Sequence, residues 1–242
     1  MSDLYTDLAD VYDTVFDWDI SDEAAWLAAR LGPDCRRVLE PGCGAGRMFG
    51  PLAAHGLAVT GIDSSPQMVE LARRRGTGEA VLADMTDFDV GVFDGAVCPI
   101  NTLGHLSPAE LDAHLVAMSR ALVPGARYLV QLAIGAEVGV ESRWEVERAG
   151  TRIRARWLVE SRDVEHGTEL HRSVFELLEG RRAGERHEQV HAMTYWTSET
   201  WGAAVAASPL EWVAVYDGAE AGRPQAGFDA VGGLLWHELR RP

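Results

Sequence analysis

The sequence contains no lysine, so all 22 of its basic residues are arginines. A chain without lysine side chains cannot form a Schiff base through them and cannot build a P-loop for nucleotide phosphates. Cysteine is also scarce: Cys35, Cys43 and Cys98 are too few and too scattered for a disulfide framework or a zinc cluster. No apolar stretch approaches the roughly 20 residues of a membrane helix, and the acidic start lacks the features of a signal peptide. We therefore expect a cytoplasmic protein with no membrane contact and no metal.

Positive charge is in deficit as well, because 37 acidic residues give a net charge of −15. Such a surface repels phosphate backbones, and no stretch concentrates enough arginine to overcome the repulsion. We expect a small molecule, and no nucleic acid, as the partner. The 242 residues suffice for a single domain with an elaboration, and the sequence leaves the oligomeric state open, with a homodimer among the options.

Strand-like and helix-like segments alternate after a helical N-terminal region over residues 1–33, which we expect to form a lid. The expected strands cover 37–41, 58–63, 79–84, 93–99, 126–134, 210–218 and 232–239; the expected helices cover 47–56, 64–76, 107–125 and 198–208. Either Ser64 or Ser65 is expected to cap the second of these helices. The pattern predicts an α/β fold with a Rossmann-like, doubly wound sheet of seven strands, the last of which include one antiparallel strand.

The pattern changes between about residues 140 and 197, where short-period alternation predicts an inserted antiparallel β cap of three or four strands. Arg152, Arg154 and Arg156 alternate with apolar residues there; they suit either a clamp for an anionic acceptor or a solvated face paired with acids. Several cap side chains suit either an aromatic acceptor pocket or the core. These are Trp144, Trp157, His171, Tyr195 and Trp196.

One cap segment, His187 to His191, spells the H-E-x-x-H zinc-protease motif. The motif binds zinc only on a helix, whereas the flanking residues predict a strand. On a strand the two histidines would lie roughly 13 Å apart. We therefore expect no zinc site here.

A glycine-rich loop follows the first strand in VLEPGCGAGRM, residues 38–48. Glycines at this point let a ligand approach the backbone. The spacing of Gly42, Gly44 and Gly46 differs from the dinucleotide fingerprint G-x-G-x-x-G, and Arg47 stands where its third glycine belongs. This difference disfavours a nicotinamide dehydrogenase.

Two acids flank this loop in the predicted sheet. Glu40 precedes the loop, and a carboxylate there is a poor neighbour for a pyrophosphate but a good one for a cation or an ammonium group. Asp63 ends the second strand, 17 residues after Gly46, where an acid can bind both hydroxyls of a ribose. Together they favour a positively charged nucleoside without phosphates.

Three motifs in order, E-x-G-x-G-x-G at 40–46, V-T-G-I-D-x-S-x-x-M at 59–68 and A-D-M at 83–85, resemble those of class I S-adenosylmethionine-dependent methyltransferases. The resemblance implies S-adenosylmethionine as the cofactor. It implies that the methionine part meets Glu40, Gly42 and Gly44, the ribose and adenosine meet Asp63, Ser64 and Met68, and the adenine edge meets Asp84 and Met85. Met68 suits a core position equally well. Cys43, inside the loop, is a further candidate cofactor contact and suits a small filler better than a nucleophile.

The acceptor is expected beside the fourth strand, where CPINTLGHL covers residues 98–106. An amine or hydroxyl acceptor must lose a proton, and ligands collect at the carboxyl ends of such strands. Pro99 is a candidate cofactor contact in this segment. His105 is its one titratable side chain with an ordinary pKa near neutrality, which makes it a candidate base or acceptor-orienting group. The alternative is a loop histidine bonded to backbone.

The opening segment, LYTDLADVYDTVFD, resembles the Y-x-x-x-A-x-x-Y-D start of small-molecule methyltransferases that N-methylate amino sugars on bacterial natural products. In that family the opening helix folds over the cofactor, which implies that Tyr5 and Tyr12 lie near the sulfonium or the acceptor, with Tyr12 a catalytic candidate. TLGHL matches the family's segment after the fourth strand in part.

These features predict methyl transfer from S-adenosylmethionine to a nitrogen or oxygen of a small molecule, in bacterial secondary metabolism. An O- or C-methylating relative is one alternative. Another is a protein that binds the cofactor as a sensor or catalyses a reaction other than methyl transfer.

Overall fold

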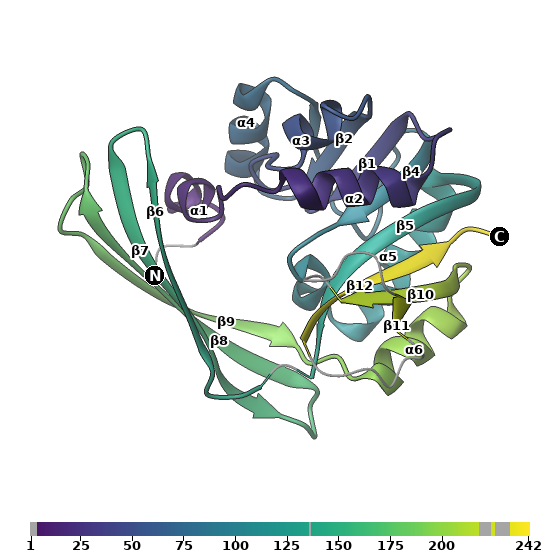
Figure 1. The fold of residues 1–242 in the computed structure, drawn as a ribbon. Helices are drawn as coiled ribbons and strands as arrows, with labels where there is room; N and C mark the ends of the chain where they lie inside the picture. The colour runs from purple at the N-terminus through teal and green to yellow at the C-terminus, as the bar shows by residue number, and fades with distance from the viewer. Residues whose placement is uncertain (1–3, 136, 218–223, 226–232) are drawn as a thin grey trace.

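The computed structural model describes residues 4–135, 137–217, 224–225 and 233–242. Among these residues, eight strands form one sheet in the order β11-β10-β12-β5-β4-β1-β2-β3 (Figure 1). Strands β1 to β5 run parallel, whereas β12 is antiparallel to both of its neighbours. The bounds are Arg37–Pro41 (β1), Ala58–Asp63 (β2), Glu79–Leu82 (β3), Phe93–Cys98 (β4), Leu122–Ile134 (β5), Glu211–Asp217 (β10), Pro224–Gln225 (β11) and Gly233–Arg240 (β12). The doubly wound sheet of seven strands is confirmed, and the two-residue β11 extends its edge.

Helices cover both faces of this sheet (Figure 1). One face carries α2 (Ser21–Leu31), α3 (Phe49–Ala53) and α4 (Pro66–Arg75), and the other carries α5 (Pro108–Ala121) and α6 (Ser198–Ala207). Leu27 and Phe49 are buried in the first core cluster, and Leu115 and Trp201 in the second. Burial of both faces explains why the parallel strands are apolar throughout.

The helix expected over 107–125 is shorter than predicted. It begins with a capping box between Ser107 and Glu110 but ends at Ala121, and Leu122 already pairs with Phe93 of β4. The register of this pair shifts before Gly95, beside Pro124 and Gly125. The Pro-Gly pair therefore belongs to an irregular strand start, not to the end of a helix.

A second sheet, which we call the cap, holds β6 (Glu141–Arg148), β7 (Thr151–Asp163), β8 (Thr168–Glu179) and β9 (Arg186–Thr194), all antiparallel. Ala149 and Gly150 join β6 to β7, and both have positive φ values, 50° and 75°. A two-residue loop of this conformation matches the twist of a hairpin. The inserted antiparallel cap is thus confirmed.

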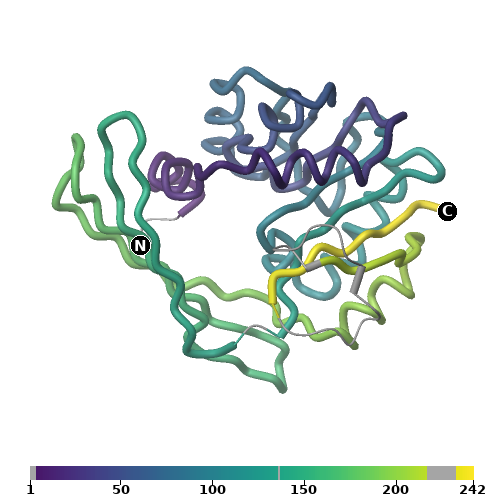
Figure 2. The backbone as a smooth tube through the Cα atoms, viewed as in Figure 1, coloured from purple at the N-terminus to yellow at the C-terminus, as the bar shows by residue number. Residues whose placement is uncertain are grey.

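Helix α1 (Ala9–Val15) lies between the cap and the main sheet (Figures 1 and 2). Val11 and Val15 pack against Ile153 and Phe175 of the cap. Two acids, Asp13 in the helix and Asp17 just after its end, pair with Arg75 of α4 and also with Arg148 of the cap. The helix is therefore held from both sides.

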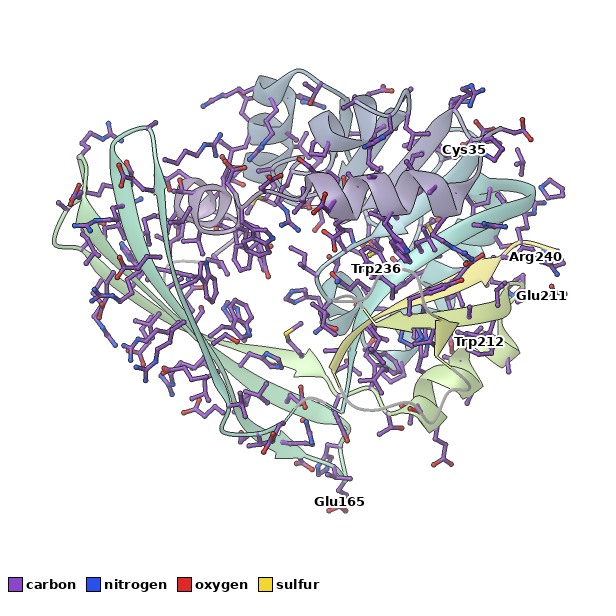
Figure 3. All side chains as sticks on the ribbon, viewed as in Figure 1. Cys35, Glu165, Glu211, Trp212, Trp236 and Arg240 are labelled. Carbon is purple, nitrogen blue, oxygen red and sulfur yellow. The ribbon has the colours of Figure 1, made fainter. Side chains whose placement is uncertain are left out.

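The segment that spells the zinc-protease motif was predicted to form a strand. The H-E-x-x-H segment lies on β9, so the strand prediction is right, and no group of three metal-binding side chains occurs among the described residues. Glu211 and Arg240 form an ion pair 2.6 Å long across β10 and β12 (Figure 3). No helix in the described ranges is long and apolar enough to span a membrane.

Candidate active site

The glycine loop after β1 is held in a conformation that other residues adopt at a cost. Gly42, Gly44 and Gly46 have φ values of +65°, +53° and +74°. A Cβ at Gly42 would lie 2.3 Å from Cγ2 of Thr102. The loop is therefore packed closely against the segment that follows β4, at the carboxyl edge of the sheet.

Asp63, at the end of β2, ties this loop to α4. Its Oδ2 accepts the Gly44 N–H and its Oδ1 accepts the Ser65 N–H, each at 2.8 Å. Burial raises the pKa of this carboxyl. Ser65, not Ser64, caps α4 by accepting the Met68 N–H at 3.2 Å. Ser64 is exposed beside it.

Glu40 and Arg47 are two ionisable side chains with buried polar atoms that lack a hydrogen-bond partner in the described residues. Oε2 of Glu40 and both terminal nitrogens of Arg47 are buried and have no hydrogen-bond partner within the described residues. The Arg47 guanidinium lies over the Trp18 ring, 4.5 Å from its centroid. Burial raises the pKa of Glu40 to about 8 and lowers that of Arg47. An ammonium and a carboxylate on one ligand would compensate both groups.

Both side chains line one cavity, together with most of the predicted methionine-end contacts. Its lining comprises Tyr12, Asp13, Phe16, Glu40, Gly42, Cys43, Gly44, Ala45, Arg47, Arg75, Pro99, Ile100 and Thr102. We did not predict a binding role for Arg47 from the sequence, although it directly follows the last glycine of the loop. The Cys43 side chain packs against Gly61, and burial raises its thiol pKa well above the usual range, as suits a small filler.

The predicted adenosine contacts lie outside the lining of this cavity. Met68 is buried with Ala9 and Ala45, which agrees with the core alternative. Asp84 accepts the N–H and hydroxyl of Thr86, at 2.8 and 2.7 Å, and these bonds lower the pKa of its carboxyl.

Met85 has a buried partner that the sequence did not reveal. Nδ1 of His114 lies 2.9 Å from the Met85 carbonyl, and its Nε2 lies 2.8 Å from the Tyr128 hydroxyl. Because a carbonyl only accepts, Nδ1 carries the proton and Nε2 accepts from Tyr128. His114 therefore holds the backbone of the A-D-M motif in place through this hydrogen bond.

The segment after β4 is strained and firmly held. Ile100 and Asn101 both have positive φ, 47° and 58°. Gln131 accepts both of their N–H groups, and Oδ1 of Asn101 accepts the Ala133 N–H at 2.9 Å. Strain of this kind persists where neighbours enforce it, and it is common at functional sites. It positions the 3-10 helix η1 (Thr102–His105).

His105 bonds a side chain of the N-terminal segment that precedes α1. Its Nε2 lies 2.9 Å from the hydroxyl of Tyr5. His105 is exposed, yet the protein packed beside it removes part of the hydration of its imidazole, and this desolvation, with the nearby His191 and His171, lowers the pKa of His105 to about 4. The Tyr12 ring lies against Gly44, and burial raises its pKa to about 12. At neutral pH the histidine is uncharged and Tyr12 keeps its proton.

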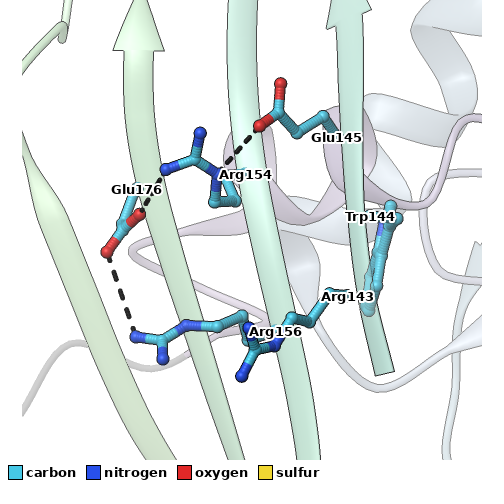
Figure 4. A pocket seen from close by; sticks show the side chains of 6 residues that line it. All are labelled: Arg143, Trp144, Glu145, Arg154, Arg156 and Glu176. Atoms are coloured by element: carbon cyan, nitrogen blue, oxygen red, sulfur yellow. Dashed lines mark hydrogen bonds and ion pairs between the residues drawn. The ribbon is translucent and has the colours of Figure 1, made fainter. Parts of the chain in front are cut away.

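The arginine row of the cap lies away from this region. Arg154 pairs with Glu145 and Glu176, and Arg156 lies 3.9 Å from Glu176 (Figure 4). The alternate residues Ile153 and Ala155 are buried against α1, so the row is on the opposite face. Its charges are paired on a solvated surface, which favours that alternative over an anion clamp.

Comparisons with known proteins identify the class. Residues 38–125 match the family model for a methyltransferase domain. The chain is 31% identical over 223 residues to dTDP-3-amino-3,6-dideoxy-α-D-glucopyranose N,N-dimethyltransferase of Streptomyces fradiae. The alignment covers 86% of each chain. Two solved structures share the fold at 24% identity. The amino pentose methyltransferase CalS10 of Micromonospora echinaspora has a TM-score of 0.76 with full coverage of both chains. The sugar N-methyltransferase KedS8 of Streptoalloteichus has a TM-score of 0.75, with 96% of this chain and 92% of KedS8 covered.

The chain therefore belongs to the S-adenosylmethionine-dependent methyltransferases, and S-adenosylmethionine is its cofactor. The residues present fit this cofactor, because Glu40 and Arg47, whose buried polar atoms lack hydrogen-bond partners in the described residues, suit the ammonium and the carboxylate of its amino-acid end.

Proposed function

We propose that this enzyme methylates the amine nitrogen of a small, hydroxylated acceptor of the amino-sugar class in bacterial natural-product biosynthesis. The observation that carries the proposal is the Tyr5–His105 pair, which joins the lid to the loop after β4. A hydroxyl that donates to a neutral imidazole presents its oxygen as an acceptor for an amine N–H. The amino-sugar N,N-dimethyltransferase of Streptomyces fradiae supports the acceptor class.

The charged residues would hold the cofactor at one end of the site. Glu40 would pair with the ammonium and Arg47 with the carboxylate of the methionine part, while Asp63 would bind the ribose. The cofactor supplies a methyl group already activated on a sulfonium. The protein then has to align the acceptor lone pair behind that methyl and keep water away.

Tyr5 and His105 would perform the alignment. With a pKa near 4, His105 is too weak a base to keep a proton at neutral pH. It would instead hold Tyr5 so that the phenol oxygen accepts one N–H of the neutral amine, which directs the nitrogen lone pair to the methyl. The proton released on transfer passes to water.

The test begins with calorimetry of the purified protein with S-adenosylmethionine, S-adenosylhomocysteine and NAD. Formation of S-adenosylhomocysteine is then measured with amino sugars, simple amines and phenols. We expect affinity for the first two ligands and turnover with amino sugars. Turnover restricted to phenols, or none with any amine, would contradict the proposal. Arg154→Gln, on the outer face of the cap, is the matched control.

A further inference from the structure

The inner face of the cap is divided into two halves of different chemistry. One half is apolar and packs on α1. The other half, which we call the acceptor face, is polar and consists of Trp157, His171, Ser173, Gln189 and His191. Strand register places Ser173 opposite both Trp157 and Gln189, and His171 opposite His191, so all five share one side of the sheet.

The acceptor face looks toward the Tyr5–His105 pair. The Tyr5 ring centroid lies 6.5 Å from that of His191 and 5.4 Å from that of His105. The end of β9 is also docked on the loop after β4, because the Thr194 hydroxyl donates to the Leu106 carbonyl at 2.7 Å. An acceptor in contact with both regions would place its amine at the Tyr5–His105 pair and its ring against the acceptor face.

A chain of buried and half-buried contacts fixes part of this face. The Trp157 indole N–H donates to Nδ1 of His171 at 2.9 Å, and Nε2 of His171 lies 2.9 Å from Oε2 of Glu169. Since an indole nitrogen only donates, Nδ1 must be unprotonated and Nε2–H must donate to Glu169. Trp157 in turn stacks on His191, with centroids 5.4 Å apart and an interplanar angle of 4°. The two rings are therefore held in one orientation.

Gln189 is the side chain on this face that lacks a partner for its amide nitrogen. The residue is 7% exposed, and Nε2 is buried without a hydrogen bond in the described residues. Its neighbour Ser173 is satisfied by Nε2 of His191 at 3.0 Å. A buried amide donor of this kind is stabilised by a ligand that supplies an acceptor. A hydroxyl can donate and accept, so it would satisfy either orientation of the amide.

The charge on this side favours a neutral ligand group. Glu169 is the buried carboxylate here, and it is bonded by both Arg162 and His171. We propose that the acceptor face binds a hydroxyl on the ring of the acceptor through Gln189, with Glu169 and His171 as positioning residues that act through Trp157. This inference rests on the proposed function and names the part of the acceptor that this site recognises.

The test combines Gln189→Leu with acceptors that lack one ring hydroxyl at a time. The wild-type enzyme should lose about tenfold in kcat/KM on the deoxy analogue whose missing hydroxyl meets Gln189. Gln189→Leu should raise the acceptor KM by a similar factor, leave S-adenosylmethionine affinity unchanged, and treat that analogue and its parent alike. Equal discrimination by the variant and the wild type would overturn the proposal.

Two acceptor series, the amino sugar free and the same sugar joined to a nucleoside diphosphate, show whether the hydroxyl belongs to the sugar or to the nucleoside. If no amine is methylated, the proposed function fails, but the recognition is still measurable. Calorimetry of the amino sugar with S-adenosylhomocysteine bound should then show weaker affinity for Gln189→Leu, and equal affinity would reject the acceptor face as well.

The positioning residues are tested at His171. His171→Phe removes the acceptor for Trp157, so it should shift the indole N–H resonance and raise the acceptor KM while cofactor affinity is unchanged. His171→Asn keeps an acceptor oxygen near the place of Nδ1 and should restore most of the loss. Equal KM values in wild type and His171→Phe, or no restoration by asparagine, would contradict the role.

Discussion

The cofactor side of the site and the acceptor face of the cap are built in different ways. At the cofactor side, one short loop and the ends of neighbouring parallel strands supply the backbone turn and the acids. At the cap, long strands supply side chains that orient one another through hydrogen bonds and stacking. A change at the first should therefore affect cofactor binding directly, whereas a change at the second should affect which acceptor is used.

Gly42→Ala should cause the largest loss of cofactor affinity. The new Cβ would lie 2.3 Å from Thr102 and would stand at a φ of +65°, so both collision and strain oppose it. We expect S-adenosylmethionine affinity to fall at least about 100-fold by calorimetry. Gly56→Ala, with a φ of +79° and open space around it, is the control for strain and should bind the cofactor normally. Tight binding by Gly42→Ala would refute the assignment of this loop.

Arg47→Gln tests the charge that the sequence did not assign. Loss of a charge-assisted hydrogen bond to the methionine carboxylate should weaken cofactor affinity roughly 30-fold, with little change in acceptor KM at saturating cofactor. Decarboxylated S-adenosylmethionine should bind the variant and the wild type equally. A variant that still distinguishes the two cofactors would place the carboxylate elsewhere.

His105→Ala tests the acceptor side of the site. We expect kcat to fall about tenfold, because Tyr5 loses the group that orients it, while calorimetric affinity for S-adenosylmethionine stays the same. Tyr5→Phe should show a similar fall, and the double variant should be little worse than either single one. Unchanged turnover in His105→Ala removes the residue from the mechanism.

The smallest effect concerns pH and Glu40. Its pKa is raised to about 8 in the fold from an ordinary value of 4.5, so the unfolded chain ionises first as pH rises. The stability that the protonated group contributes is therefore complete below pH 4.5 and is lost as pH approaches 8. We expect the unliganded wild type to lose more Tm between pH 5 and 8 than Glu40→Gln, and cofactor affinity to rise over the same range. Parallel Tm profiles for the two proteins would contradict this account.

The sequence predicted the main sheet well because its strands are continuously apolar and its turns carry glycine. It misplaced the end of α5, since Pro124 and Gly125 resemble a helix stop but form an irregular strand start. Glu40 and Asp63, the acids proposed to bind the cofactor, could be predicted because they lie at or near the carboxyl ends of strands.

Other contacts depend on tertiary structure and could not be found from the sequence. His114 reaches Met85 across 29 residues, and Tyr5 reaches His105 across 100. The left-handed backbone at Ile100 follows from Gln131 on the neighbouring strand, which no local pattern reveals. Chemistry at strand ends is thus readable from local sequence, whereas pairing between lid, loop and cap is not.

The acids in and just after α1 have a consequence for the architecture as a whole. Asp13 and Asp17 are the shared counter-ions of Arg75 on one body and Arg148 on the other. Without them, two guanidinium groups would face each other with their charges uncompensated. The N-terminal segment is thus an electrostatic spacer between the sheet and the cap, alongside the direct contact that the end of β9 makes with the loop after β4.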